Sequence, residues 1–229
     1  MASRKNNKKK QSFLNKGNSR YDRHDAYYRQ AKKDGYVARS IYKLEEIDDA
    51  LGVIKKDDRV LDLGCAPGSW LQYVVHKVGS KKGAVVGIDL LEVKLSFGQH
   101  VKIIQGDAFE ADTEILRPNN FNTEHNGPYF DVVLSDMAPN TTGIKSVDQD
   151  RSLALCEQAL YLAVKMLKPG GNFCVKVLEG GGVQNYVKIC RSAFSNVKIR
   201  RPKGTRVGSM ETYVVALGLK TGVDADTLW

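Results

Sequence analysis

Several features that would assign a protein to a class at once are missing from this sequence. No apolar run is long enough to cross a membrane, so a membrane-spanning protein is not predicted. The four cysteines are scattered without the spacing of metal ligands, which indicates reduced thiols, no disulfide and no bound metal. The basic first ten residues contain no apolar core, so they do not form a secretory signal. We therefore expect a cytoplasmic protein.

A glycine turn is present, but the third glycine of the dinucleotide-binding fingerprint is absent. The stretch Asp62–Trp70 follows an apolar run and precedes a predicted helix, Leu71–Val78. It contains Gly64 and Gly68, whereas Pro67 has no N–H to offer a pyrophosphate. Ligands of open α/β sheets bind at such strand-to-helix junctions. The turn predicts a nucleotide-like cofactor without phosphates and disfavours a nicotinamide oxidoreductase.

Two carboxylates follow the next two predicted strands. Asp89 lies 25 positions after Gly64, close to the offset of a carboxylate that binds ribose hydroxyls. Asp107 ends the following strand, where it could accept a hydrogen bond from an adenine amino group. Either acid alone could be an ordinary turn or helix-cap residue. Together with the glycine turn they predict S-adenosylmethionine as the cofactor.

Positive charge is concentrated at the N-terminus. Residues 1–43 contain 13 Lys or Arg and 3 Asp or Glu, whereas residues 44–229 contain 22 and 23. Tyrosines are interleaved with the basic residues beyond position 20, as expected of a segment that grips phosphates and stacks on bases. A second basic group lies within Lys198–Arg206. Both groups indicate a nucleic-acid substrate, and the alternative for residues 1–20 is a solvated tail.

Helical and strand patterns alternate along the chain. They predict one α/β domain with a Rossmann-like fold, a seven-stranded mostly parallel sheet with helices on both faces. Residues 168–171 are expected to close a helix as a loop. The predicted helices are Ala38–Leu51, Leu71–Val78, Asp148–Leu167 and Val183–Phe194, and the predicted strands are Val60–Leu61, Ala84–Ile88, Val101–Ile104, Asp131–Ser135, Phe173–Leu178, Val197–Arg201 and Thr212–Leu217.

The last two strands should be antiparallel, because residues 202–211 are too few for a crossover helix. A reversed last strand begins where its parallel neighbours end, so Glu211 should share a rim with the glycine turn and Asp136. Lys176 interrupts an apolar strand of the kind buried in parallel sheets. A snorkelling side chain or a structural pair with Glu179 is the alternative, but carboxylates on the same rim favour a functional lysine.

Four segments of the chain resemble the FtsJ-type (RrmJ-like) ribosomal RNA 2′-O-methyltransferases. They are the loop DLGCAPGSW, Ser135–Asn140, Val175–Val177 and Ser209–Glu211, and the resemblance spans residues 36–220. It implies a catalytic tetrad of Lys43, Asp136, Lys176 and Glu211, in which Lys176 is the candidate base. Helix composition alone would make Lys43 a solvated residue, so its role rests on the resemblance. The glycine turn, the acids and the resemblance together give these candidate cofactor-binding residues: Gly64, Pro67, Gly68, Trp70, Asp89, Asp107 and Asp136.

The resemblance further implies that the Rossmann-like fold is that of a class I methyltransferase. It also implies S-adenosylmethionine-dependent methylation of a uridine ribose in large-subunit 23S ribosomal RNA. The implied partner is ribosomal RNA or the large ribosomal subunit, and we expect a monomer with no membrane contact and no obligate protein partner. Alternatives are a 2′-O-methyltransferase acting on transfer RNA or an mRNA cap, and an RNA-binding ribosome assembly factor that has lost catalysis. The expected parts are a disordered basic arm over residues 1–20, a methyltransferase domain with an N-terminal RNA-binding helical segment over 21–220, and a flexible tail over 221–229.

Overall fold

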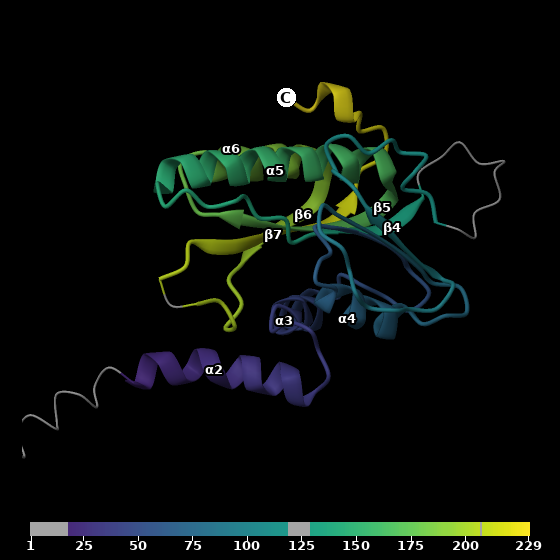
Figure 1. Cartoon of the computed structure of the whole chain (residues 1–229). Helices are drawn as coiled ribbons and strands as arrows, with labels where there is room; N and C mark the ends of the chain where they lie inside the picture. The colour runs from purple at the N-terminus through teal and green to yellow at the C-terminus, as the bar shows by residue number, and fades with distance from the viewer. Residues whose placement is uncertain (1–17, 119–128, 207) are drawn as a thin grey trace, which may run out of the picture.

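The computed structural model describes residues 18–118, 129–206 and 208–229 of the chain. In these residues a seven-stranded sheet is covered by helices on both faces (Figure 1). The strands are β1 (Arg59–Leu63), β2 (Ala84–Asp89), β3 (Val101–Gln105), β4 (Phe130–Ser135), β5 (Leu167–Leu178), β6 (Phe194–Arg200) and β7 (Glu211–Leu219). The helices are α2 (Asn18–Lys33), α3 (Ile41–Leu51), α4 (Ser69–Val78), α5 (Lys145–Met166), α6 (Val183–Ala193) and the 3-10 helix η1 (Ala225–Thr227).

The strand order β3-β2-β1-β4-β5-β7-β6 creates a crevice at the centre of the sheet. The chain moves outward from β1 to β3 and then returns to place β4 on the other side of β1. Such a reversal separates the loops that follow the two central strands. The glycine turn follows β1 and Asp136 follows β4, so both lie at this crevice. The predicted Rossmann-like class is confirmed, and β7 runs antiparallel to β5 and β6 as predicted.

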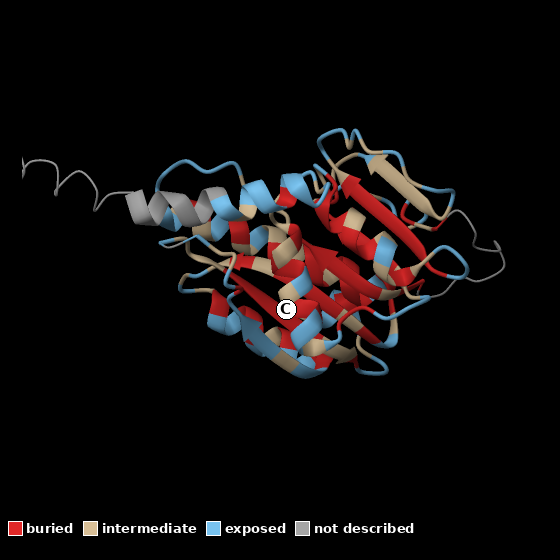
Figure 2. Ribbon diagram, turned by 90° about the horizontal axis from the view of Figure 1, so that it is seen from below, coloured by how far each residue is buried: buried red, intermediate tan, exposed pale blue. Residues whose placement is uncertain are grey.

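Two apolar layers hold the helices to the sheet. Alternate side chains of a strand point to opposite faces, so Leu61 and Leu63 of β1 pack on the α5 and α6 side, whereas Val60 packs on the α3 and α4 side. The buried residues in Figure 2 accordingly fill the strands and the inner faces of the helices. Beyond α3 lies α2, and the rings of Tyr27 and Tyr42 are 5.8 Å apart between these two helices.

Two strands, β5 and β6, begin at least three residues earlier than their composition predicts. The segment Lys168–Gly171, predicted as a loop, belongs to β5, because Leu167 already pairs with Phe130 of β4. The register then shifts, so a bulge accommodates the proline and glycines. Phe194, predicted as the end of a helix, pairs with Leu219 as the first residue of β6. In both cases pairing with a neighbouring strand overrides a local signal.

The ends of the chain are described in part. Residues 1–17 of the expected basic arm lie outside the described residues, and residues 18–20 form the first turn of α2. Near the C-terminus, η1 places Ala225 in the core, whereas Trp229 is exposed. Among the described helices, none has both the length and the apolar character that a membrane span requires. The division of the chain into arm, domain and tail stays a prediction.

Candidate active site

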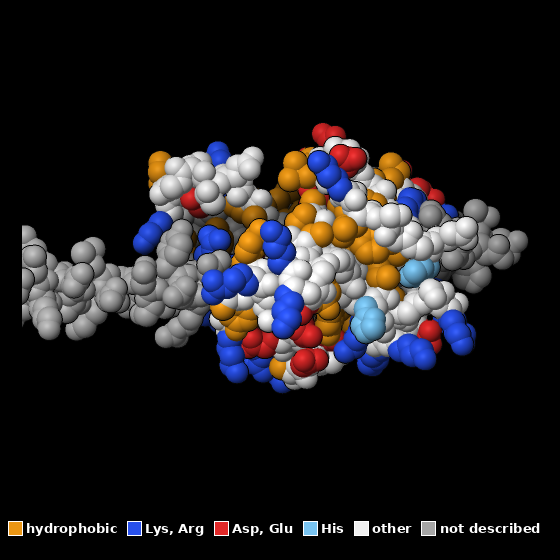
Figure 3. Space-filling model, turned by 60° about the horizontal axis from the view of Figure 1, so that its bottom comes forward, with side chains coloured by type: hydrophobic (Ala, Val, Ile, Leu, Met, Phe, Trp, Pro, Cys, Tyr) orange, Lys and Arg blue, Asp and Glu red, His pale blue; other side chains and the backbone are white. Residues whose placement is uncertain are grey.

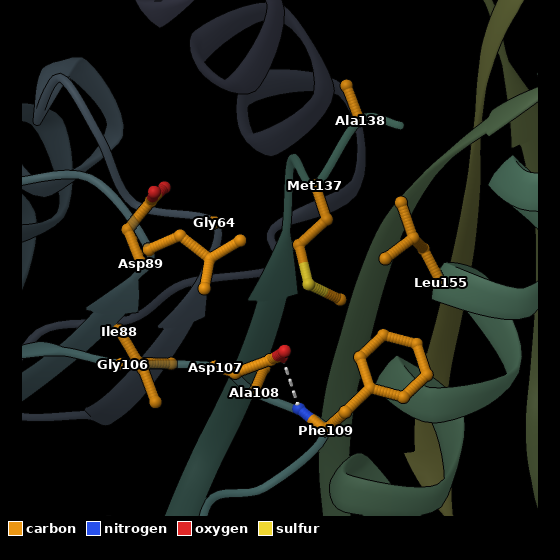
Figure 4. Close-up of a pocket in the computed structure, with 11 residues that line it drawn as sticks. Gly64, Ile88, Asp89, Gly106, Asp107, Ala108, Phe109, Met137, Ala138 and Leu155 are labelled. Carbon is orange, nitrogen blue, oxygen red and sulfur yellow. Dashed lines mark hydrogen bonds between the residues drawn. The ribbon is translucent and has the colours of Figure 1, made fainter. Parts of the chain in front are cut away.

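A cavity of about 220 Å³ lies at the carboxyl ends of the central strands. It brings together three predicted cofactor residues: Gly64 directly after β1, Asp89 at the end of β2 and Asp107 in the loop after β3. Figure 4 shows Asp89 on one side of this cavity and Phe109 and Leu155 on the other. The full lining is Gly64, Ile88, Asp89, Leu90, Gly106, Asp107, Ala108, Phe109, Met137, Ala138 and Leu155.

Asp89 ties the glycine turn to the loop after β2. Its Oδ2 accepts a hydrogen bond of 2.8 Å from the Ala66 N–H, and its Oδ1 accepts one of 2.8 Å from the Leu91 N–H. A carboxylate offers about four acceptor sites, so Asp89 keeps capacity for further donors. Two ribose hydroxyls are donors of the required kind, and the backbone bonds fix the carboxylate in place to receive them.

Asp107 lies at the opposite end of a mostly apolar lining. Its Oδ1 accepts a hydrogen bond of 2.9 Å from the Phe109 N–H, which Figure 4 marks. A carboxylate offers about four acceptor sites, so Asp107 can also accept a hydrogen bond from an amino group. The Phe109 ring is half exposed, and with Ile88 and Leu155 it offers apolar surface to a planar base. Because no Lys or Arg is among the described residues that line the cavity, this donor and acceptor set fits an adenosine cofactor without phosphates.

Gly64 allows the loop after β4 to approach the glycine turn. Its φ is +76°, and a Cβ atom there would lie 2.7–2.9 Å from the backbone and Cγ of Met137. A side chain at this position would therefore displace Met137, which lines the cavity, together with the adjacent Asp136. The glycine thus brings the cofactor cavity next to Asp136.

Pro67, Gly68 and Trp70 do not line the cavity. Trp70 is 2% exposed, its indole N–H donates a hydrogen bond of 3.0 Å to the Ser40 carbonyl, and its ring lies 6.0 Å from that of Tyr213. This residue connects α4 to the start of α3. Asp136 does not line the cavity either, and the cofactor contacts of all seven predicted residues stay predictions.

All four residues of the proposed tetrad come together next to the cavity. Lys43 on α3 pairs with Glu211 on β7, with 2.5 Å between Nζ and Oε1. Lys176 on β5 pairs with Asp136 after β4, with 3.0 Å between Nζ and Oδ1, and also donates to the Asp136 carbonyl. The four side chains are between 10% and 20% exposed. Lys176 therefore pairs with Asp136 and not with Glu179, the alternative considered from the sequence.

Glu211 carries a negative charge in this setting. Burial raises the pKa of the carboxyl, but the ammonium of Lys43 and hydrogen bonds from Lys43 and Tyr213 outweigh burial, so the pKa is lowered overall. Lowering the pKa keeps the carboxylate ionised at neutral pH. The cluster can thus hold two lysine amines at the edge of the cavity, each fixed by an oxygen acceptor.

Asp62 is a buried acid that the sequence analysis did not single out. It is fully buried on β1, and neither carboxyl oxygen has a hydrogen-bond partner in the part of the chain that the structure describes. Burial raises the pKa of this carboxyl well above its usual value, and the charges of Asp136 and Asp89 raise it further. The sequence signal is its place in an apolar strand directly before the glycine turn.

Asp62→Asn is expected to weaken the dependence of stability on pH. The folded protein keeps a proton on Asp62 that the unfolded chain releases above about pH 3.9. The free energy of unfolding therefore falls as the pH rises from that value to the raised pKa, by up to about 1.4 kcal/mol per pH unit. Urea unfolding at pH 5 and pH 8 should show a smaller difference for Asp62→Asn than for the wild type. The exposed Glu92→Gln should follow the wild type, and equal differences for all three proteins would contradict the assignment.

Comparisons with known proteins agree with this geometry. Residues 36–219 match the model of the FtsJ-like methyltransferase family. Ribosomal RNA large subunit methyltransferase E of Desulfatibacillum aliphaticivorans is 46% identical over 198 residues, which cover 86% of this chain and 92% of that protein. The protein of the same name from Syntrophobacter fumaroxidans is 44% identical over 200 residues, which cover 87% of this chain and 98% of the relative.

A solved structure has the same fold. It is a crystal structure from Plasmodium falciparum of a protein described as a ribosomal RNA methyltransferase, with a TM-score of 0.66 and 26% sequence identity. The match covers 80% of this chain and 98% of that chain. The family match spans the sheet, the cavity and all four residues of the tetrad. The chain belongs to the FtsJ-like methyltransferase family.

Proposed function

We propose that the protein methylates a ribose 2′-hydroxyl of large-subunit ribosomal RNA. The observation that carries the proposal is the cluster of two lysine–carboxylate pairs at the edge of the cofactor cavity. The relatives from Desulfatibacillum and Syntrophobacter, whose names specify the large ribosomal subunit, support this substrate class. The target is proposed to be a uridine of 23S RNA, modified by a cytoplasmic monomer without an obligate protein partner.

S-adenosylmethionine is the methyl donor of this family and supplies a methyl group bound to a positively charged sulfur. In the cavity, Asp89 would hold the ribose hydroxyls and Asp107 the adenine amino group. Ile88, Phe109 and Leu155 would exclude water from the base. The carboxylates would thus orient the cofactor, and the apolar side chains would bury its base.

Lys176 and Lys43 are proposed to hold the target ribose. A 2′-hydroxyl must lose its proton as it attacks a methyl group, and a neutral Lys176 can accept that proton. As an ammonium, Lys176 orients the hydroxyl instead, and Lys43 orients the ribose from α3. Orientation of this kind can lower a barrier by about 7–11 kcal/mol, and proton removal contributes about 10²–10⁴-fold.

Basic side chains lie on two segments that contact α3, the helix that carries Lys43. Figure 3 shows Lys and Arg side chains gathered on the side of the molecule that carries α2. The loop between β6 and β7 is held against α3 by a hydrogen bond of 2.9 Å from the Lys203 N–H to Glu46, so the second basic group lies near Lys43. RNA phosphates could therefore bind on both sides of the active lysines. Among the residues of α2 and of the second group whose burial the structure describes, the exposed basic ones are Arg29, Lys32, Lys33, Lys198, Arg200, Arg201, Lys203 and Arg206.

Removal of residues 1–17 is expected to weaken RNA binding and leave cofactor affinity unchanged. The segment contains six Lys or Arg residues, and each single-strand phosphate contact that is lost should reduce the slope of log affinity against log salt by about 0.7. Filter binding at several salt concentrations measures the slope. A control protein that keeps the length of the segment, with its basic residues changed to Ser, should behave like the truncation. If the slope of both variants equals that of the full chain, the arm does not bind phosphate.

Methyl transfer from labelled S-adenosylmethionine tests the proposed substrate. The protein is incubated separately with 23S ribosomal RNA, large ribosomal subunits, transfer RNA and capped mRNA. Label is expected in large-subunit RNA, free or assembled. Label confined to transfer RNA or the cap would overturn the proposed substrate class. No label in any RNA would favour an assembly factor without catalysis.

A further inference from the structure

The phenolic hydroxyl of Tyr213 lies between the two lysine–carboxylate pairs. It is 3.0 Å from Oδ1 of Asp136 and 2.8 Å from Oε1 of Glu211, and Tyr213 is fully buried. The same two oxygens are paired with Lys176 and Lys43. Five side chains therefore form one continuous network, with the tyrosine at its centre and a lysine at each end.

The sheet and α4 fix the position of this hydroxyl. Tyr213 on β7 is the direct cross-strand partner of Lys176 on β5, and such partners share a face of the sheet. Glu211 lies two residues before Tyr213 and therefore points to the same face. The Trp70 ring packs against the Tyr213 ring at 6.0 Å. The hydroxyl has little freedom to move away from either carboxylate.

One phenolic proton faces two acceptors in this arrangement. A tyrosine hydroxyl donates a single hydrogen bond, so it can satisfy Asp136 or Glu211 but not both at once. In the other contact, the phenolic oxygen and a carboxylate oxygen lie close together with no proton between them. This contact is tolerated because each carboxylate also faces the amine of a lysine. A change in the charge of either lysine therefore changes which carboxylate accepts the hydrogen bond from Tyr213. The hydroxyl thus links the two pairs electrostatically.

We propose that Tyr213 is a positioning residue for methyl transfer, whose hydroxyl couples the two lysine–carboxylate pairs and sets the spacing of the two amines. The proposal rests on the function proposed above for the same site. Tyr213 does not touch the reacting atoms in this account and acts through Asp136 and Glu211. Its hydroxyl donates a hydrogen bond to one of the two carboxylates at a time, and that carboxylate then depends less on its lysine.

The electrostatics of the network agree with a hydroxyl that remains protonated. Burial raises the pKa of Tyr213 well above its usual value, and the negative charges of Asp136 and Glu211 raise it further. Besides the tetrad, three titratable groups face the network. Burial raises the pKa of Asp62 on β1 and of the Cys174 thiol on β5, so both stay protonated and uncharged, whereas Arg39 before α3 carries a positive charge that acts on Glu211. The phenol is therefore a hydrogen-bond donor across the working pH range.

Tyr213→Phe removes the hydroxyl and keeps the ring. The single-turnover rate of methyl transfer at saturating RNA and cofactor is expected to fall by about 10- to 100-fold, because both lysines lose a fixed position. Without the phenolic donor, the carboxylates should hold the lysines as ammonium ions more strongly. The limb of the pH–rate profile that rises with pH should therefore move to higher pH, with both dissociation constants within about twofold of the wild type. Rates are expressed per cofactor-binding site, so a partly unfolded variant does not mimic the effect.

Tyr186→Phe is the matched control. Tyr186 is a second fully buried tyrosine, on α6 at the other face of the sheet, and donates a hydrogen bond of 2.8 Å to the Cys156 carbonyl. This variant loses a buried hydroxyl of the same kind but should keep the wild-type rate and pH profile. The same rate loss in both tyrosine variants, with neither pH profile moved, would reduce Tyr213 to a structural residue.

Glu211→Gln, alone and combined with Tyr213→Phe, provides a second measurement. If Tyr213 acts through the carboxylates, the two rate losses should not multiply, because the hydroxyl and Glu211 share one network. Fully multiplicative losses, or a Tyr213→Phe protein with the rate and pH profile of the wild type, would overturn the proposal. A wild-type protein that does not methylate ribose would instead overturn the proposed function, so the two failures are distinguishable.

Discussion

Lys176→Ala is expected to lower the single-turnover rate of methyl transfer by at least about 10²-fold at saturating RNA and cofactor. Lys176 is held by Asp136 at 3.0 Å and lies outside the lining of the cofactor cavity. Its loss should therefore remove proton transfer or orientation of the 2′-hydroxyl and leave both dissociation constants nearly intact. The rate is measured by rapid mixing of labelled cofactor with preformed protein–RNA complex.

Lys176→Arg separates the two roles of the lysine. An arginine remains protonated at any accessible pH and cannot act as a base, although its guanidinium can still donate hydrogen bonds. Rescue of the rate by Lys176→Arg would identify orientation as the main role. If Lys176 is the base, the wild-type rate should rise with pH along a limb that both variants lack.

Lys168→Ala is the control for loss of a lysine–aspartate pair. Lys168 also lies on β5 and pairs with Asp131 on β4 at 3.0 Å, but at the opposite end of these strands from Lys176. The control should keep the wild-type rate, since its pair is remote from the cavity. A near-normal rate for Lys176→Ala would show that the lysine in the apolar strand is structural and that the mechanism is wrong.

Asp89→Ala is expected to weaken S-adenosylmethionine binding by about 1.5–3 kcal/mol, or about 10- to 150-fold in Kd. The carboxylate supplies charge-assisted hydrogen bonds to the ribose and also holds the backbone of Ala66 and Leu91. Removal of the side chain should therefore reduce affinity through lost contacts and a less ordered cavity wall. Isothermal titration calorimetry gives the Kd, and RNA affinity should stay close to that of the wild type.

Glu92→Ala is the control for the removal of an acid from this region. Glu92 lies in the loop that follows Asp89, is exposed and does not line the cavity. Its replacement should leave the Kd unchanged. Unchanged cofactor affinity in a folded Asp89→Ala protein would exclude Asp89 from the ribose site.

The sheet and the cofactor side of the site could largely be predicted from local patterns. Apolar runs that end in Gly64, Asp89 and Asp107 placed these residues at strand ends, and parallel strands bring such ends to one edge. The short segment before Glu211 predicted an antiparallel β7, and that orientation places the carboxylate beside Lys43. These inferences need only the apolar pattern of the strands, the length of one connection and the geometry of sheets.

The other side of the site could not be predicted in this way. Lys43 has the sequence context of a solvated helical lysine, yet it is 8% exposed because α3 packs against the sheet beside β7. Its role was implied only by resemblance to a family. Leu155 enters the cavity from the middle of α5, where a leucine is an ordinary core residue. The positions of both side chains depend on how segments far apart in the sequence pack together, and local sequence patterns do not show this packing.

Tyr213 could have been found from the sequence but was not. Once Glu211 is placed at the start of an antiparallel strand, the residue two positions later must share its face. Asp62 is a similar case, because an acid inside a buried strand before a glycine turn needs an explanation. In both cases the side chain interrupts an apolar pattern at the edge of the candidate site.

The position of the transferred methyl group tests the central claim most directly. Ribosomal RNA is incubated with the protein and isotopically labelled S-adenosylmethionine, digested to nucleosides and analysed by mass spectrometry. Label is expected on a 2′-O-methylated ribose, at a single nucleotide of the large-subunit RNA, and almost none is expected with Lys176→Ala. Label on a base, or equal ribose labelling by the wild type and Lys176→Ala, would contradict the central claim.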